Sequence, residues 1–292
     1  MEHPLIDKCP SCKDTSYTPF LQTKDWFLSQ EDFELLKCTT CSLIYTKNVP
    51  ANIASYYKSD DYISHSETKN ILSFVYKGVQ GFTLRSKKQL LCEYSQGNKI
   101  LDYGAGKGDF TNYLHRSGFD ITGYEPDPGA RRLANEKHGI TLQASIEGVA
   151  GNSLDAVTLW HVLEHIPNPN EIIQQLLLKL KQTAVIIVAV PNYQSFDADH
   201  YKEFWAAYDV PRHVTHYERS SMSFLMNKNG LKVIETKPMF FDSTYVSLLS
   251  EKYRATQTGK TLSLFNQLKA IIIGLASNLA LITNKNRCSS II

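Results

Sequence analysis

A glycine-rich turn between an apolar segment and a helical pattern is the feature that most restricts the fold of this chain. Residues 100–103 have the length of a strand, the run Gly104-Ala105-Gly106-Lys107-Gly108 follows, and a helical pattern begins at Asp109. Glycines at such a turn allow a tight backbone and the close approach of a ligand. Open α/β sheets bind ligands at this end of their strands. The motif therefore predicts a small-molecule site at the carboxyl edge of a parallel sheet.

The rest of the pattern agrees with an α/β fold. Strands are predicted at 100–103, 119–124, 140–143, 156–160, 184–190, 231–235 and 288–292. Helices are predicted at 51–57, 66–94, 109–117, 128–138, 169–181 and 218–229, and in an insertion at 243–284. Alternation of this kind indicates a Rossmann-like sheet of seven mostly parallel strands with helices on both faces. A helical cap and a small N-terminal module complete the expected fold.

The glycine spacing and a following acid narrow the ligand class. The glycines fall as G-x-G-x-G, whereas dinucleotide folds use G-x-G-x-x-G and Walker loops place Lys before Ser or Thr. The next predicted strand ends at Glu125, and an acid at that position can accept hydrogen bonds from both ribose hydroxyls of a nucleoside. A surface acid before a proline turn is the alternative for Glu125 taken alone. Together, the two features favour a nucleoside-containing cofactor.

Four of the six cysteines form two close pairs, Cys9-x-x-Cys12 and Cys38-x-x-Cys41. Each pair can hold one edge of a tetrahedral zinc ion, and four thiolates leave no open position for catalysis. The polar N-terminus lacks an apolar export signal, so we expect a cytoplasmic protein in which zinc is favoured over disulfides. The pairs therefore predict a structural zinc site.

Composition and charge exclude some partners. The net charge is +2, and residues 1–50 hold five Lys against seven acids, so no nucleic-acid partner is expected. The apolar run 262–283 contains Asn, Gln and Lys, which favours a buried or lid-forming helix over a membrane span. Association with a membrane surface stays open, as does the oligomeric state.

Residues 99–240 resemble the class I S-adenosylmethionine-dependent methyltransferases, in their small-molecule branch. The resemblance is carried by the runs at 101–108, 123–125, 154–157, 163–169, 190–192 and 211–214, among them Leu163-Glu164-His165 and Pro211-Arg212-His213. Similar cysteine knots precede the catalytic domain of deoxysugar C-methyltransferases, which is a hint about the acceptor.

The resemblance implies a cofactor site in four groups of residues. The glycine loop contributes Asp102, Gly104, Ala105, Gly106, Gly108 and Phe110. The later groups are Glu125 with Pro126 at the ribose, then Ala144, Ser145 and Ile146 around the adenine, then Trp160, His161 and His165 after the fourth strand. Many relatives carry Asp where Ser145 stands, which puts the contact with the adenine amino group in doubt.

Three histidines are catalytic candidates: His213, His216 and His161. A histidine within hydrogen-bond reach can remove a proton from an acceptor hydroxyl or carbon acid. The alternative is that the segment around His213 only packs and caps the loop before the next helix. Ubiquinone-pathway O-methyltransferases resemble residues 161–165 and bind a divalent metal there, whereas many relatives have the Glu-His pair without a metal.

The acceptor site is expected beneath the 51–80 helices, the 201–216 segment and the insertion. These segments are rich in aromatic and histidine side chains, namely Tyr56, Tyr57, Tyr62, His65, Tyr201, Trp205, Tyr208 and His213. Such residues suit the wall of a mostly apolar pocket. The alternative is that they pack the subdomains together.

We expect three parts: a zinc-binding module at 1–50, a helical linker or cap at 51–97, and a methyltransferase domain at 98–292. The predicted function is methyl transfer from S-adenosylmethionine to oxygen or carbon of a small molecule such as a sugar, a quinone-like compound or a lipid-linked metabolite. Two alternatives remain open: an RNA methyltransferase that uses the zinc module as a clamp, and a cofactor-binding scaffold without turnover.

Overall fold

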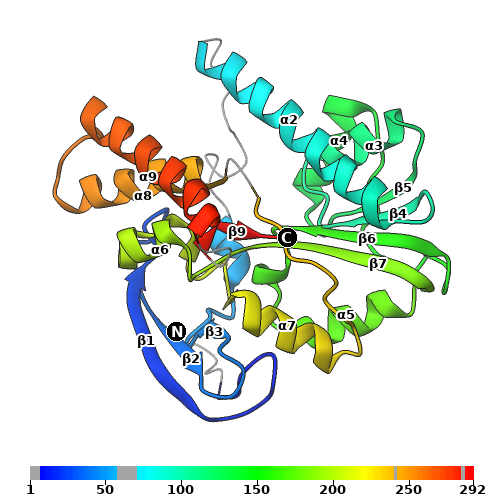
Figure 1. Ribbon diagram of the computed structural model, residues 1–292, viewed down its shortest axis with the longest axis horizontal. Coiled ribbons are helices and arrows are strands. Elements are labelled where there is room, and N and C mark those ends of the chain that lie inside the picture. Colours follow the sequence, from blue (N-terminus) through cyan, green and yellow to red (C-terminus); the bar gives the residue numbers. More distant parts are fainter. Residues whose placement is uncertain (1–6, 58–70, 240–241, 284–286) are drawn as a thin grey trace. The chain divides into compact units, whose positions relative to one another are not determined.

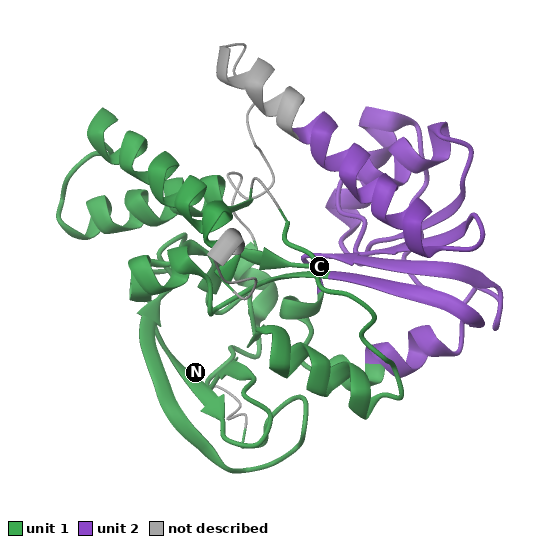
Figure 2. Ribbon diagram, viewed as in Figure 1, with its two compact units in different colours: residues 1–59, 163–171, 189–292 green, residues 60–162, 172–188 purple. Residues whose placement is uncertain are grey.

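The computed structural model describes residues 7–57, 71–239, 242–283 and 287–292 (Figure 1). The chain divides into two compact units that do not follow chain order (Figure 2). Unit 1 comprises residues 1–59, 163–171 and 189–292, and unit 2 comprises residues 60–162 and 172–188. Tyr62 and His65, which were expected near the acceptor, lie outside the described residues.

Unit 2 is built on parallel strands with helices packed against them. Its strands are β4 (Lys99–Tyr103), β5 (Asp120–Tyr124), β6 (Leu154–Trp160) and most of β7 (Leu180–Pro191). Its helices are α2 (Ile71–Tyr94), α3 (Asp109–Arg116), α4 (Pro128–His138) and the end of α5 (Pro169–Leu177). Strand β4 pairs in parallel with both β5 and β6. Helices α2, α3 and α4 lie on one face and the end of α5 on the other (Figure 1).

The main sheet has five strands in the described residues, in the order β5-β4-β6-β7-β9, so the expectation of seven was wrong. The predicted strand 140–143 is reduced to one bridge between Gln143 and Tyr124. The predicted strand 231–235 has no ladder partner among the described residues, and hydrogen bonding to the C-terminal strand begins only at Lys237, next to Pro238, which bridges Ile291 of β9 (Ser290–Ile291). The apolar content of residues 231–235 predicted a strand but did not indicate which other strand it would pair with. The antiparallel pairing of β7 with β9 makes the sheet mixed.

Unit 1 contains a second, antiparallel sheet in the order β1-β2-β3-β8. Its strands are β1 (Tyr17–Lys24), β2 (Asp32–Cys38), β3 (Ile44–Thr46) and β8 (Thr215–His216). The helices of unit 1 are η1 (Ile53–Tyr57), η2 (Leu163–His165), α6 (Phe196–Tyr201), η3 (Lys202–Phe204), η4 (Ala206–Tyr208), α7 (Arg219–Lys228), α8 (Asp242–Gln257) and α9 (Leu264–Thr283). Because β3 pairs with β8, the cysteine-rich N-terminal segment and residues 215–216 belong to the same sheet.

Helix ends follow local capping chemistry. Asp127 accepts a hydrogen bond from the N–H of Ala130 at 2.7 Å, Pro128 occupies the first turn, and Gly139 ends α4 with φ 68°. Such a cap satisfies backbone donors that have no partner inside the helix. The bounds of α4 match the sequence prediction because each of these signals is local.

Four of the eight side chains expected to line an acceptor cleft form part of a buried core instead. Tyr56, Tyr201, Trp205 and Tyr208 belong to one cluster in unit 1, and none of them is more than 8 % exposed. Ile44 of the cysteine-rich segment packs in the same cluster. The expectation failed because composition does not distinguish a ligand-binding wall from a core of the same residue types.

The insertion forms the helical hairpin of α8 and α9, which confirms its helical character (Figure 1). The structure contradicts a fully buried α9, because Leu264 and Phe265 are 72 % and 75 % exposed. In the described part of the chain, none of the helices is long and apolar enough to cross a membrane.

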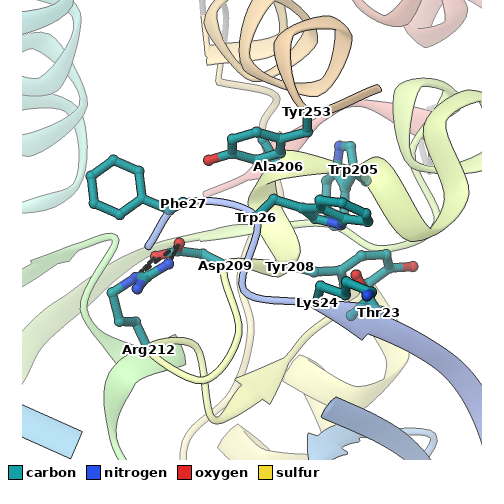
Figure 3. A pocket seen from close by; sticks show the side chains of 10 residues that line it. All are labelled: Thr23, Lys24, Trp26, Phe27, Trp205, Ala206, Tyr208, Asp209, Arg212 and Tyr253. Atoms are coloured by element: carbon teal, nitrogen blue, oxygen red, sulfur yellow. Dashed lines mark hydrogen bonds and ion pairs between the residues drawn. The ribbon is translucent and has the colours of Figure 1, made fainter. Parts of the chain in front are cut away.

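A buried guanidinium connects three segments of unit 1. Arg212 Nη2 lies 2.8 Å from Asp25 Oδ1 and 2.6 Å from Asp209 Oδ1, and the Arg212 and Asp25 side chains have no exposed surface. Arg212 Nη1 also donates to the carbonyl of Tyr56 at 3.2 Å. Figure 3 shows Arg212 directed at Asp209 beside a cavity of about 10 Å³, enough for about one water molecule.

We predict that Arg212→Leu lowers the free energy of unfolding by about 3–5 kcal/mol, because it leaves two carboxylates buried without their cation. The matched control is Arg287→Leu, which removes an exposed ion pair with Asp199 of the same 2.6 Å length. Its cost should stay below about 1 kcal/mol. Equal losses in urea titrations of the two variants would contradict a central role for Arg212.

Candidate functional site

The glycine loop of unit 2 adopts a backbone that only glycine fits at its first position. The N–H groups of Gly104 and Ala105 both donate to the carbonyl of Tyr124 at 2.8 Å. Gly104 has φ 78°, and a Cβ there would lie 2.5 Å from Val162 Cγ2. No described atom lies within 4 Å of a Cβ placed at Gly106. The loop is therefore held against the β5 end at Gly104 and open to a ligand at Gly106.

Glu125 connects this loop to the end of β5. Its Oε2 accepts a hydrogen bond from the N–H of Gly106 at 2.8 Å, and its Oε1 accepts one from the N–H of Asp127 at 2.9 Å. Burial raises the pKa of the Glu125 carboxyl, against the lowering effect of these two hydrogen bonds. A carboxylate has about four acceptor positions, so both oxygens retain capacity for hydroxyl donors.

Asp102, at the end of β4, is fixed by two threonines. Thr111 donates to its Oδ2 at 2.8 Å and Thr158 donates to its Oδ1 at 3.0 Å. Burial raises the pKa of the Asp102 carboxyl, and the two hydroxyls partly offset this effect. The structure thus gives Asp102 a role in joining β4, α3 and β6, in addition to the predicted role toward the cofactor.

Trp160 and Phe110 form an aromatic corner that includes a lysine overlooked in the sequence. Their rings meet edge to face with centroids 5.6 Å apart. Lys87 Nζ of α2 lies 4.6 Å from the Trp160 ring centroid and 5.8 Å from that of Phe110. Trp160 Nε1 is buried without a hydrogen-bond acceptor among the described residues. Nothing in the helical pattern of residues 66–94 distinguished Lys87 from its neighbours.

The remaining predicted cofactor residues of unit 2 lie in adjoining turns. Ala144, Ser145 and Ile146 follow the bridge at Gln143, and only Ile146 is half-buried. The others are Pro126 (exposed), Gly108 (φ 73°) and His161 (half-buried, φ 56°). His161 directly follows β6, as the sequence predicted.

Unit 1 holds the other predicted histidines, which we call the histidine cluster: His165, His213 and His216. The rings of His165 and His213 meet edge to face at 4.6 Å, and those of His213 and His216 are 6.4 Å apart. His213 Nδ1 lies 2.8 Å from the carbonyl of Ala207, and His165 Nδ1 lies 3.1 Å from that of Arg212. His213 Nδ1 therefore acts as a donor, which leaves its Nε2 as the acceptor, whereas His165 Nδ1 also lies 3.1 Å from the Tyr57 hydroxyl, which can donate to it.

The cluster differs in basicity from one member to the next. Burial lowers the pKa of His216 to about 3 and that of His165 to about 4, and the nearby His213 adds to both effects. An efficient general base has a pKa near the working pH. These values favour packing roles for His165 and His216.

Glu164 and two members of the histidine cluster together have ligand types suited to a cation. Glu164, His165 and His213 each place one ligand atom within 4.8 Å of the others. Imidazoles whose Nδ1–H is held by a carbonyl present Nε2 in the orientation that metal sites use. The first residue of the metal motif in the resembling relatives is His161 here, and it is not in this group.

The four-cysteine centre, made by Cys9, Cys12, Cys38 and Cys41, consists of two equivalent turns. Lys13 N–H donates to the carbonyl of Cys9 at 2.9 Å and Ser42 N–H to that of Cys38 at 3.1 Å, with φ 68° and 60° at the two donors. The Sγ atoms of Cys9 and Cys41 are 3.5 Å apart, and those of Cys12 and Cys38 are 3.4 Å apart. A tetrahedral site with Zn–S bonds of 2.3 Å needs about 3.8 Å, so these cysteines fit zinc.

A family model described as a methyltransferase domain matches residues 79–236, which is more than half of the chain. The chain therefore belongs to the methyltransferase domain family. This match includes the glycine loop, Glu125, β6 and the whole histidine cluster.

Individual relatives cover less of the chain. A ubiquinone biosynthesis O-methyltransferase of Actinobacillus pleuropneumoniae is 33 % identical over 110 residues, which cover 33 % of this chain and 47 % of the relative. The mitochondrial ubiquinone biosynthesis O-methyltransferase of Schizosaccharomyces pombe is 27 % identical over 103 residues, covering 32 % and 38 %. The chain thus spans about half the length, or less, of these relatives. A SAM-dependent methyltransferase structure from Archaeoglobus fulgidus aligns with a TM-score of 0.48 and 15 % identity, covering 75 % of this chain and 96 % of that one.

Proposed function

We propose that this chain is an S-adenosylmethionine-dependent methyltransferase that methylates a hydroxyl group of a quinone-like or phenolic small molecule. The observation that carries the proposal is the bridge from Glu125 to the N–H of Gly106, which places a carboxylate beside the open part of the glycine loop. Family membership supports methyl transfer, and the names of the curated relatives support the hydroxyl and the quinone-like acceptor.

The cofactor would be held by residues of unit 2. Glu125 would accept the ribose hydroxyls, the turn at 104–106 would allow the methionine end to approach the backbone, and residues 144–146 would flank the adenine. The buried Nε1 of Trp160 is a donor that a ligand oxygen could satisfy. When bound, S-adenosylmethionine supplies a methyl group that its sulfonium charge already activates.

The acceptor hydroxyl would lose one proton when its oxygen is methylated. His213 Nε2 would take the proton of the acceptor hydroxyl, because Nδ1 is engaged by the Ala207 carbonyl and Asp209 Oδ2 lies 4.0 Å from Nε2. The carboxylate of Asp209 would stabilise the imidazolium that results. His165 of the histidine cluster follows the end of β6 by five residues in the chain. We therefore assign this cluster to the acceptor side.

The four-cysteine centre would hold one structural zinc ion. Burial raises the pKa of the Cys12 thiol to about 11, so thiolates gathered in this setting call for a cation. Asn170 Nδ2 donates to the carbonyls of Pro10 and Ser11 at 3.0 and 2.9 Å, which ties the first cysteine turn to α5.

We predict that Glu125→Ala weakens S-adenosylmethionine binding by about 1–3 kcal/mol, through the loss of charge-assisted hydrogen bonds. Isothermal calorimetry measures the change. The control is Asp127→Ala, which removes the α4 cap but leaves Glu125 in place, and should alter stability rather than affinity. Unchanged affinity in Glu125→Ala would remove this residue from the cofactor site.

We predict that the purified protein carries one zinc ion per chain and that Cys38→Ser loses it and destabilises residues 1–50, because metal binding and folding are coupled. Elemental analysis and limited proteolysis measure the two effects. Cys92→Ser, at an exposed cysteine of α2 in unit 2, should keep the metal. Wild-type protein prepared without chelator and found free of zinc would refute the assignment.

We predict that His213→Ala lowers methyl transfer by roughly 10²-fold or more, the usual range for loss of a general base, and leaves cofactor affinity intact. The assay follows labelled methyl groups into pools of phenolic, quinone-like and sugar acceptors. His115→Ala, at an exposed histidine of α3, is the control. Cofactor binding by wild-type protein without transfer to any pool would favour the scaffold alternative, and transfer to RNA would favour the RNA methyltransferase.

A further inference from the structure

Helix α9 turns its large apolar side chains outward. The exposed large hydrophobic residues of this helix form what we call the apolar stripe: Leu264, Phe265, Leu268, Ile271, Ile272, Leu275 and Leu279. Among the described side chains of residues 264–280, Gln267 is the one other exposed position. At 3.6 residues per turn the seven positions fall within an arc of about 120°, so they form one continuous face along the helix.

The inner face of α9 is made of small residues. Ala270, Gly274 and Ser277 are buried, and a Cβ at Gly274 would lie 2.6 Å from the Cα of Thr244 in α8. On the α8 side, Ser243 donates to the carbonyl of Gly274 at 3.0 Å. Close contact through small residues with large apolar residues outside reverses the usual pattern of a water-exposed helix and resembles the packing of helices in lipid.

The hairpin also differs from the rest of the chain in charge. Residues 242–283 hold four Lys and Arg against two Asp and Glu, net +2, whereas the rest of the chain holds 27 of each and has no net charge. One of the two acids, Glu251, is buried beside Lys269 at 2.8 Å. In the described part of the hairpin the exposed charged residues are Lys252 and Lys260, and Lys260 lies four residues before the stripe begins.

We propose that the α8–α9 hairpin docks on the surface of an anionic phospholipid bilayer, with the apolar stripe inserted in the plane of the interface. An exposed apolar face of this extent marks an interaction site, and a helix with apolar residues on one side and flanking Lys fits an interfacial position. Basic residues near such a face are attracted to anionic headgroups. No described helix is suited to span the bilayer, which agrees with binding from one side.

A second copy of the chain is the other occupant to consider for the stripe. Two copies that meet through α9 would bring two hairpins of net +2 together, so like charges would oppose their association. An anionic lipid surface offers the opposite sign. Charge complementarity therefore favours the bilayer.

The test is co-sedimentation of the full chain with vesicles of phosphatidylcholine alone or with one-third phosphatidylglycerol. We expect binding to the anionic vesicles that high salt weakens, and much weaker binding to the neutral ones. Phe265→Gln with Ile272→Gln should reduce binding roughly tenfold or more, because each residue contributes buried apolar area. Lys252→Glu with Lys260→Glu should reduce binding to anionic vesicles selectively.

The matched control removes two equally exposed apolar residues elsewhere. Leu178 and Ile234 are 71 % and 66 % exposed, against 75 % and 64 % for Phe265 and Ile272. Leu178→Gln with Ile234→Gln should bind vesicles like the wild type, and thermal unfolding should confirm that both double variants fold. The proposal is overturned if the wild type ignores anionic vesicles, or if both double variants bind equally. It is also overturned if sedimentation equilibrium shows a dimer that Phe265→Gln with Ile272→Gln dissociates.

Discussion

The buried guanidinium of Arg212 is the interaction on which the architecture of unit 1 depends. It bonds to Asp25 in the turn after β1, to Asp209 in the loop after η4, and to the carbonyl of Tyr56 in η1. A cation in that position requires all three partners, because a missing one would leave a charge buried without compensation. The position of the adjacent residue His213 therefore depends on a hydrogen-bond network that includes Asp25 of the cysteine-rich segment.

Unit 2 rests on a different kind of constraint, one of backbone geometry. The turn after β4 needs a left-handed residue without a side chain at Gly104, and Glu125 then receives the N–H of Gly106. The carboxylate and the loop fix each other through this hydrogen bond. Such preorganisation lowers the entropic cost of binding, which suits a site for a flexible cofactor.

Signals confined to a few neighbouring residues were read correctly from the sequence. The helix that begins at Pro128 and the strand that leads into the glycine loop both occur where they were predicted. Segments that depend on distant partners were not. Residues 231–235 have strand composition, yet the C-terminal strand pairs with residues 237–239 instead. The choice among possible partners is made by the assembled sheet.

The sequence by itself determined the class of the fold, the glycine loop with Glu125, and the two cysteine pairs, since each is written in residue types at fixed short spacings. Only the tertiary structure decided that Tyr201 and Trp205 form a core, that Arg212 joins Asp25, and that α9 turns Phe265 outward. Apolar content shows that a side chain gains by leaving water. Which surface receives it depends on packing among residues far apart in the chain, and that information exists only in three dimensions.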